Sequence, residues 1–113
     1  MKIFLPVLGL LLIAAFSNGL NAKTAVGTLK GTVTDARGKA ITGATVTIQT
    51  SDGHHPHATR TDANGHFAFT RFATGQYDLR AYSLGSYSDW TKRVPIRLNK
   101  ATQIVLRISG PKA

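Results

Sequence analysis

The sequence predicts an all-β fold, a small seven-stranded β-sandwich of the Greek-key type. Three observations lead to it. Past residue 22, apolar and polar side chains alternate residue by residue in short segments, so that one side of each segment is apolar. Gly, Asp and Asn separate these segments at short intervals, and these residues are typical of the turns between strands in all-β proteins. No sustained 3.6-residue period, the mark of an amphipathic helix, occurs after residue 22.

The first 22 residues have the composition of a secretory signal peptide. They begin with the basic pair Met1-Lys2, continue with an uncharged and mostly aliphatic run over residues 3–16, and end on the small residue Ala22. This run of fourteen residues is shorter than the roughly 18 to 20 that a membrane-spanning helix needs. We therefore expect an exported protein, periplasmic or extracellular, with no transmembrane segment in its mature chain. An uncleaved membrane anchor is the alternative interpretation.

The remaining 91 residues suit one small domain. We expect a lead-in over 23–26, the domain over 27–109 and a tail over 110–113. The sequence contains no cysteine, so neither disulfide bonds nor lipidation at cysteine can support this domain. Its stability must come from packing.

The part beyond residue 22 is strongly basic. It keeps thirteen Lys and Arg against five Asp and no Glu, which gives a formal charge of +8. Such a surface attracts polyanions, so an anionic surface polymer is an expected partner, whereas specific nucleic-acid recognition is not expected. The alternative is that the charge serves only solubility.

The first strands are expected near residues 29–34 and 44–49. Leu29 and Val33 share one face of the first strand. In the second, three apolar residues alternate with Thr and Gln, which gives that strand an apolar inner side. The turn between them is expected at Asp35–Gly38, where Asp bonds back to the backbone and Gly accepts a positive φ.

Residues 51–58 are expected to form an exposed loop, followed by a short edge strand over 59–61. The tetrad Asp62–Gly65 has the composition of a tight hairpin turn, and Phe67 and Phe69 leave it on one face of the next strand.

The alternation then continues to the end of the chain. Tyr77, Leu79 and Ala81 are expected inside, and Gln76, Asp78 and Arg80 outside. Pro95 marks the strand over 94–98 as an edge strand, and the last strand covers 104–108.

Three segments in this order resemble a known family. They are GTVTDARGKAITGATVTIQT from Gly31, TRTDANGHFAFTRFATGQYDLRA from Thr59 and VPIRLNKATQIVLRI from Val94. Together they resemble the carboxypeptidase regulatory-like domain, a transthyretin-like (prealbumin-like) module. The resemblance implies a non-catalytic β-sandwich without a cofactor, and glycan binding as a family analogy.

An enzyme is the least supported alternative. The transthyretin-like superfamily includes hydroxyisourate hydrolases with a Tyr-Arg-Gly-Ser ending, but this chain ends Ser109–Ala113 without that signature. It also lacks a Gly-x-Ser-x-Gly elbow and a cysteine nucleophile. We assign no catalytic residue, and a transthyretin-like hydrolase stays a second alternative.

The segment GHHPH, residues 53–57, is a candidate metal site. His54, His55 and His57 carry imidazole nitrogens that suit zinc, copper or nickel, and His66 is a distant fourth candidate. A periplasmic metal-binding protein is therefore the first alternative function. The competing interpretation is a solvated polar loop, because a metal site needs its ligands fixed by surrounding structure.

The segment AYSLGSYSDW, residues 81–90, is the candidate contact surface. It brings Tyr82, Tyr87 and Trp90 close together in sequence, and exposed rings can stack on sugars or on another protein. Arg93 and Arg97 complete the candidate binding residues, and with Arg80 and Lys92 on the same side the surface would suit an acidic glycan. The alternative is that Trp90 and one Tyr cap the core. We expect a binding or structural module that contacts a glycan or an envelope protein.

Overall fold

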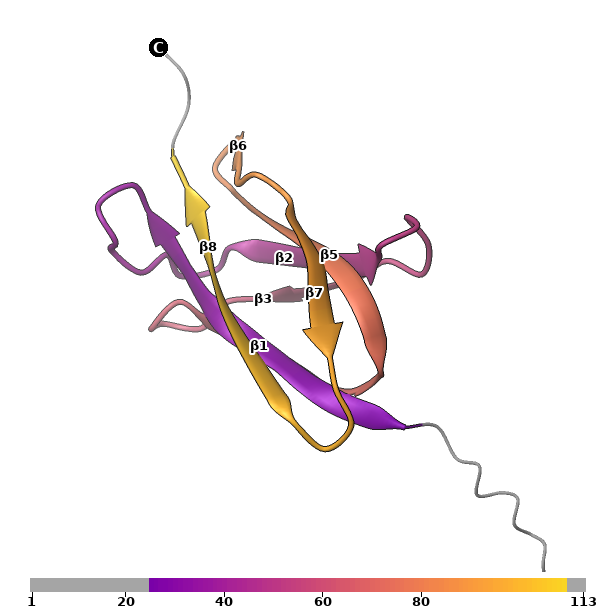
Figure 1. Ribbon diagram of the computed structural model, residues 1–113. Coiled ribbons are helices and arrows are strands. Elements are labelled where there is room, and N and C mark those ends of the chain that lie inside the picture. The colour runs from indigo at the N-terminus through magenta and orange to yellow at the C-terminus, as the bar shows by residue number, and fades with distance from the viewer. Residues whose placement is uncertain (1–24, 110–113) are drawn as a thin grey trace, which may run out of the picture.

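The computed structural model describes residues 25–109, and within that range the chain forms strands and no helix. The strands form two sheets packed face to face (Figure 1). This confirms the all-β sandwich. The strands are β1 (Val26–Asp35), β2 (Thr45–Thr50), β3 (His57–Arg60), β4 (His66–Ala73), β5 (Gly75–Ser83), β6 (Ser86–Tyr87), β7 (Thr91–Ile96) and β8 (Ala101–Ile108). The two-residue β6 is the strand that the alternation did not predict.

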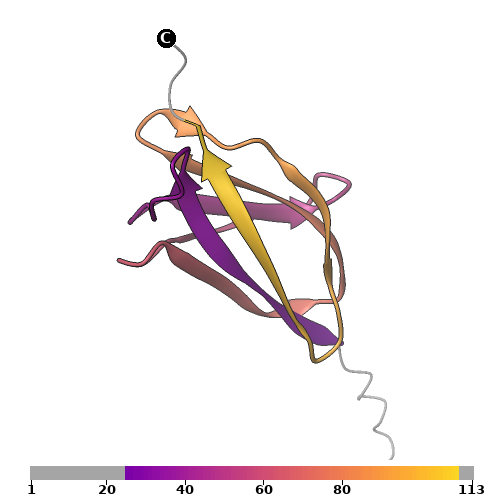
Figure 2. The same ribbon diagram turned by 60° about the vertical axis from the view of Figure 1, so that its left-hand side comes forward.

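The smaller sheet has the order β4-β1-β8, with β4 antiparallel and β8 parallel to the central β1. Figure 2 shows β8 running alongside β1. Gly31 allows the neighbouring strands to come close, because a Cβ placed there would lie 2.2 Å from the carbonyl oxygen of Ile104. The Cζ atom of the Phe67 ring lies 2.9 Å from the same position.

The larger sheet has the order β3-β2-β5-β6, and β7 also pairs with β5. The strand β5 is its centre, because it pairs with β2 along one edge and with β6 and β7 in succession along the other. All of these pairings are antiparallel. The outer face of β5 therefore lies in the middle of the sheet.

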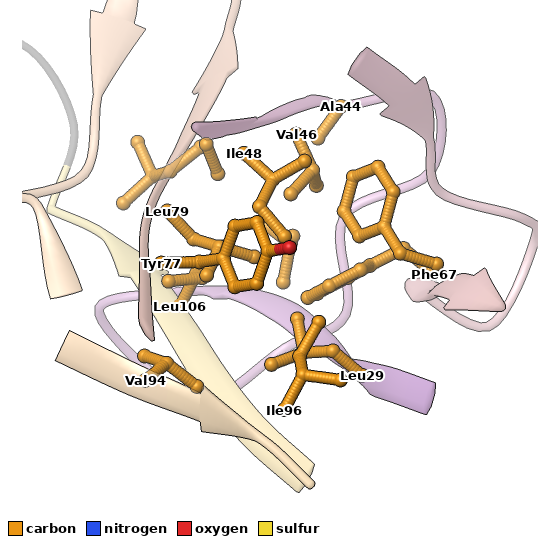
Figure 3. Packing of buried hydrophobic residues seen from close by; sticks show 14 residues of the cluster. Leu29, Ala44, Val46, Ile48, Phe67, Tyr77, Leu79, Val94, Ile96 and Leu106 are labelled. Atoms are coloured by element: carbon orange, nitrogen blue, oxygen red, sulfur yellow. The ribbon is translucent and has the colours of Figure 1, made fainter. Parts of the chain in front are cut away.

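The core lies between the two sheets (Figure 3). The inward faces predicted from the alternation are confirmed, since Leu29, Val33 and Leu79 have no exposed surface. Burying side chains of this size stabilises the fold by about 1.5–3 kcal/mol each. Tyr77 is buried with them, its hydroxyl donates to the carbonyl oxygen of Ala73 at 2.7 Å, and burial raises its pKa.

A β-bulge in β4 departs from simple alternation. Opposite the single β1 residue between Gly27 and Leu29, β4 has two residues, because Gly27 pairs with Phe72 and Leu29 with Phe69. Arg71 lies in this bulge with a φ of 56°, a left-handed conformation. As a result, Phe72 packs against the core, although continued alternation from Phe69 would have placed Arg71 there.

Strand boundaries and one side chain differ from the predictions. Val26 already belongs to β1 rather than to a lead-in, and β3 begins at His57, inside the expected loop. Asp78 was expected on the solvent side, yet it is only 6% exposed. The reason is that neighbouring segments cover the outer face of β5 at this point, as described below.

The predicted signal peptide, residues 1–22, and the tail, residues 110–113, lie outside the described residues. Among residues 25–109, no helix is long and apolar enough to span a bilayer.

Candidate functional site

Four side chains on the outer face of the larger sheet form what we call the aromatic–arginine patch: Arg80, Tyr82, Tyr87 and Trp90. Arg80 and Tyr82 are two residues apart on β5, so they point to the same side of the sheet. Tyr87 of β6 pairs directly with Tyr82. Trp90 comes just before β7, which pairs with the same strand.

The local sequence explains this arrangement. The β5–β6 hairpin turns over two residues, Leu84 and Gly85, whose φ values are 49° and 84°. Positive φ at both central positions gives the turn a twist that suits a two-residue hairpin. The turn fixes the register in which the two tyrosines lie opposite each other.

The patch is held together by stacking. The guanidinium carbon of Arg80 lies 4.0 Å from the ring centroid of Tyr87 and 4.5 Å from that of Trp90. The rings of Tyr82 and Tyr87 are 4.6 Å apart at 48°. Each cation–π contact contributes about 0.5–1 kcal/mol at an exposed site. The four side chains therefore form one ordered array before any ligand arrives.

The array is open to solvent. Tyr87 is 57% exposed and Tyr82 38%. Within residues 25–109 the one ion pair closer than 4.0 Å joins His54 to Asp52, so Arg80 has no carboxylate partner there. Its N–H groups are free to bind an incoming oxygen atom.

Buried polar groups fix the segment that carries Trp90. The backbone N–H of Ser88 donates to the carbonyl oxygen of Ala81 at 2.8 Å, and the N–H of Ala81 donates to the Ser88 hydroxyl at 2.9 Å. Because Ser88 is 6% exposed, water competes little for these bonds. They hold the chain against β5 two residues before Trp90.

Asp78 ties β5 to two other segments. Its Oδ1 accepts hydrogen bonds from the Ser51 hydroxyl and from the backbone N–H of Arg93, both at 3.0 Å. Ser51 follows β2, and Arg93 lies in β7 with a φ of 57°. The buried carboxylate thus positions β7 beside Arg80. The alternation of apolar and polar residues along the sequence does not indicate this role.

The structure sorts the predicted contact residues. Tyr82, Tyr87 and Trp90 do come together, and Trp90 packs on Arg80 outside the core cluster rather than capping it. Arg93 lies beside Asp78. Arg97 follows the far end of β7, about 20 Å along the strand from Trp90 at ~3.3 Å per residue, so it does not belong to the patch.

The histidine loop does not assemble as a ligand set. The Nδ1 atom of His54 lies 3.0 Å from a carboxylate oxygen of Asp52, and the rings of His54 and His55 are 6.2 Å apart. Hydrogen bonds from the Thr50 hydroxyl and, with a smaller effect, from His54 lower the pKa of Asp52 to about 2.

The other two histidines lie elsewhere. His57 packs edge-on against Phe72, with ring centroids 5.2 Å apart. His66 begins the same strand that holds Phe72, about 20 Å away at ~3.3 Å per residue. In the described part of the chain, no three His, Cys, Asp or Glu side chains lie close enough to hold one metal ion.

Comparisons with known proteins agree with the architecture. The family that matches is the carboxypeptidase regulatory-like domain, over residues 28–109. No curated protein matches the chain in sequence.

Several solved structures share the fold. GBS52, the minor pilin of Streptococcus agalactiae, is 18% identical with a TM-score of 0.66, over 80% of this chain and 48% of that one. The Bacillus anthracis TIE protein is 15% identical with a TM-score of 0.63, over 76% of this chain and 17% of that one. A candidate carbohydrate-binding protein of Pseudomonas aeruginosa is 15% identical with a TM-score of 0.53, over 82% of this chain and 97% of that one.

This chain therefore spans less than half of the first two of these proteins. At such low identity, the likeness establishes the fold alone.

Proposed function

The chain belongs to the carboxypeptidase regulatory-like domain family, and from that premise we propose that it is an exported, non-catalytic module that binds a glycan through the aromatic–arginine patch. One observation carries the proposal. The Arg80 guanidinium is stacked against Tyr87 and Trp90, with no carboxylate partner in the described chain, on an exposed face. Export is supported by the composition of residues 1–22.

The chemistry of the patch suits a sugar. The apolar face of a pyranose ring stacks on an exposed aromatic ring, and Tyr87 presents the most exposed one. The N–H groups of Arg80 lie beside that ring and can donate to a sugar hydroxyl or ring oxygen. Because the side chains are already stacked, binding a sugar costs little side-chain conformational entropy.

The size of the patch favours a sugar over a folded envelope protein. A stable protein interface covers about 800 Å² on each partner. Four clustered side chains provide far less, but enough for one or two sugar rings. The P. aeruginosa protein of similar fold supports a sugar as the ligand, because it is described as a candidate carbohydrate-binding protein.

The test uses a pair of substitutions at one exposed position. Tyr87→Ala removes the ring, and Tyr87→Phe keeps the ring without its hydroxyl. On a glycan array that includes polysaccharide from the native cell envelope, we expect Tyr87→Ala to weaken binding by about tenfold, because a stacking contact of ~1–1.5 kcal/mol is lost. Tyr87→Phe should bind within about twofold of the unchanged protein, since stacking persists.

Leu84→Ala is the matched control, because Leu84 is 97% exposed at the tip of the same hairpin and lies outside the stack. It should leave binding unchanged. Equal binding by Tyr87→Ala and the unchanged protein, with both folded, would rule out the patch. Failure of the unchanged protein to bind any glycan would rule out the function.

A further inference from the structure

The outer face of the smaller sheet, on the other side of the sandwich from the patch, is hollowed along β1. A hollow of about 740 Å³ lies over β1, β4 and β8, and a second of about 480 Å³ lies towards the start of β1. Lys30 lines both. The two hollows therefore adjoin at Lys30, and we call the two together the basic trough.

The walls of this basic trough carry positive charge along its whole length. Arg60 lines one end, Lys30 the middle, and Arg71 and Lys100 the other end. The cations are not neutralised by ion pairs closer than 4.0 Å within the described residues.

The one acidic residue that lines the trough is already engaged. Oδ1 of Asp62 accepts the backbone N–H groups of Asn64 at 2.8 Å and His66 at 2.9 Å. These bonds, that of His66 first, lower the pKa of Asp62, so it stays ionised and is partly compensated by its own turn. The net charge of the trough walls is therefore positive.

Two residues with a left-handed backbone line the second hollow. Arg71 reaches the outer face only because of the bulge in β4, where its φ is 56°. Asn99 lines the same hollow with a φ of 54°. For an arginine this backbone conformation is unfavourable, and such residues are found more often at functional sites. Regular alternation would have left this end of the trough without the Arg71 cation.

The dimensions suit a single extended chain. Along β1, the trough runs from Thr32 to Val26, about 20 Å at ~3.3 Å per residue. Across, it spans three strands, or about 10 Å at ~4.8 Å per spacing. A nucleic-acid duplex is wider than this.

We propose that the basic trough binds an acidic polysaccharide, a linear sugar polymer that carries carboxylate or sulfate groups. Thr32 and Gln103 in the walls offer hydroxyl and amide groups for sugar hydroxyls. A single-stranded nucleic acid would need rings to stack its bases, but no Tyr or Trp lines the trough and Phe67 is buried in the core. This site goes beyond the proposed function, because it uses no residue of the patch.

The experiment compares two double variants that lose the same charge. The double variant Lys30→Gln with Arg71→Asn removes two positively charged side chains from the walls of the trough. Asn tolerates the left-handed backbone at position 71. Arg37→Gln with Lys39→Gln removes two exposed cations that line neither hollow. Binding of the purified full-length protein to polygalacturonate and to heparin is measured by titration at several salt concentrations.

We expect the trough variant to bind at least one of the two polymers about tenfold more weakly, with a shallower salt dependence, because fewer counterions are released on binding. The control variant should change affinity by about twofold or less. Polygalacturonate and heparin separate carboxylate from sulfate recognition. Tyr87→Ala should bind both polymers as the unchanged protein does, so failure of the patch and failure of the trough give different results.

Three outcomes overturn the proposal. One is an equal loss in both double variants, which would indicate overall charge rather than a site. Another is tighter trough-dependent binding of single-stranded DNA or of anionic lipid vesicles than of either polymer, which would assign another occupant. The last is the absence of polymer binding at low salt. Thermal unfolding of both double variants confirms that each is folded.

Discussion

The outer faces of the two sheets differ in kind. On the larger sheet, aromatic rings stand exposed around one guanidinium, and a short hairpin holds them. On the smaller sheet the surface is hollowed, its walls carry cations, and the aromatic side chains Phe67 and Phe69 turn into the core. One core thus supports two surfaces of different chemistry. A two-residue hairpin positions the rings on one face, and a bulge within β4 places Arg71 on the other.

The largest expected effect tests whether both faces depend on that common core. Leu79 has no exposed surface and lies on β5 between Asp78 and Arg80. Leu79→Ala should lower the free energy of unfolding by about 2–5 kcal/mol, because it removes buried methyl groups and leaves a cavity. Urea unfolding measures the loss, and glycan and polyanion binding should decline together with the folded fraction.

The control for this change is Leu84→Ala, the same substitution at a position that is 97% exposed and lines neither hollow. It should shift stability by no more than about 0.5 kcal/mol. If Leu79→Ala abolished binding at one face and spared the other in a fully folded protein, the faces would not share one cooperative core.

An intermediate effect should separate the two faces. Asp78→Ala leaves the Arg93 N–H and the Ser51 hydroxyl without their acceptor, which should cost about 1–3 kcal/mol. Because β7 loses an anchor beside Arg80, glycan binding at the patch should weaken, while polyanion binding at the trough should persist. Thermal unfolding and both binding assays check this.

Asp78→Asn is the matched variant, because its carbonyl oxygen can still accept both hydrogen bonds. It should retain most of the stability. An equal loss of binding at both faces in the folded Asp78→Ala protein would contradict a local role for this carboxylate.

The smallest effect concerns the loop after β2, whose Asp52 belongs to neither of the two proposed sites. The pKa of Asp52 is lowered from 3.8 to about 2, first by the Thr50 hydroxyl and then by His54. The fold thus favours ionised Asp52, so this stabilisation is complete above about pH 4 and is lost as the pH falls towards 2. Asp52→Asn should reduce the loss of stability between pH 6 and pH 2.5, as measured by urea unfolding.

Some acid sensitivity should remain in that variant, because backbone N–H groups also lower the pKa values of Asp35 and Asp62. Both binding activities at pH 7 should stay unchanged. A variant with the same pH dependence as the unchanged protein would show that Asp52 contributes nothing to it.

Much of the fold could be predicted from the order of the residues. The inward side chains of β1, β2 and β5 were identified correctly because alternation is a local property of an extended chain. Tyr82, Tyr87 and Trp90 were also identified as a group, because the hairpin that joins them is short. The histidines, equally close in sequence, do not form a group of ligands in the described chain.

The chain by itself determined which side of each strand is apolar and where the turns fall, because these depend on neighbours within a few residues. Only the tertiary structure decided that Asp78 is buried, that Arg80 is the centre of the patch and that Arg71 joins the trough. Each of these results depends on segments far apart in sequence: Ser51 and β7 around Asp78, Trp90 beside Arg80, and β1 opposite the bulge. Strand pairing brings such segments together, and a local pattern contains no information about which strands pair.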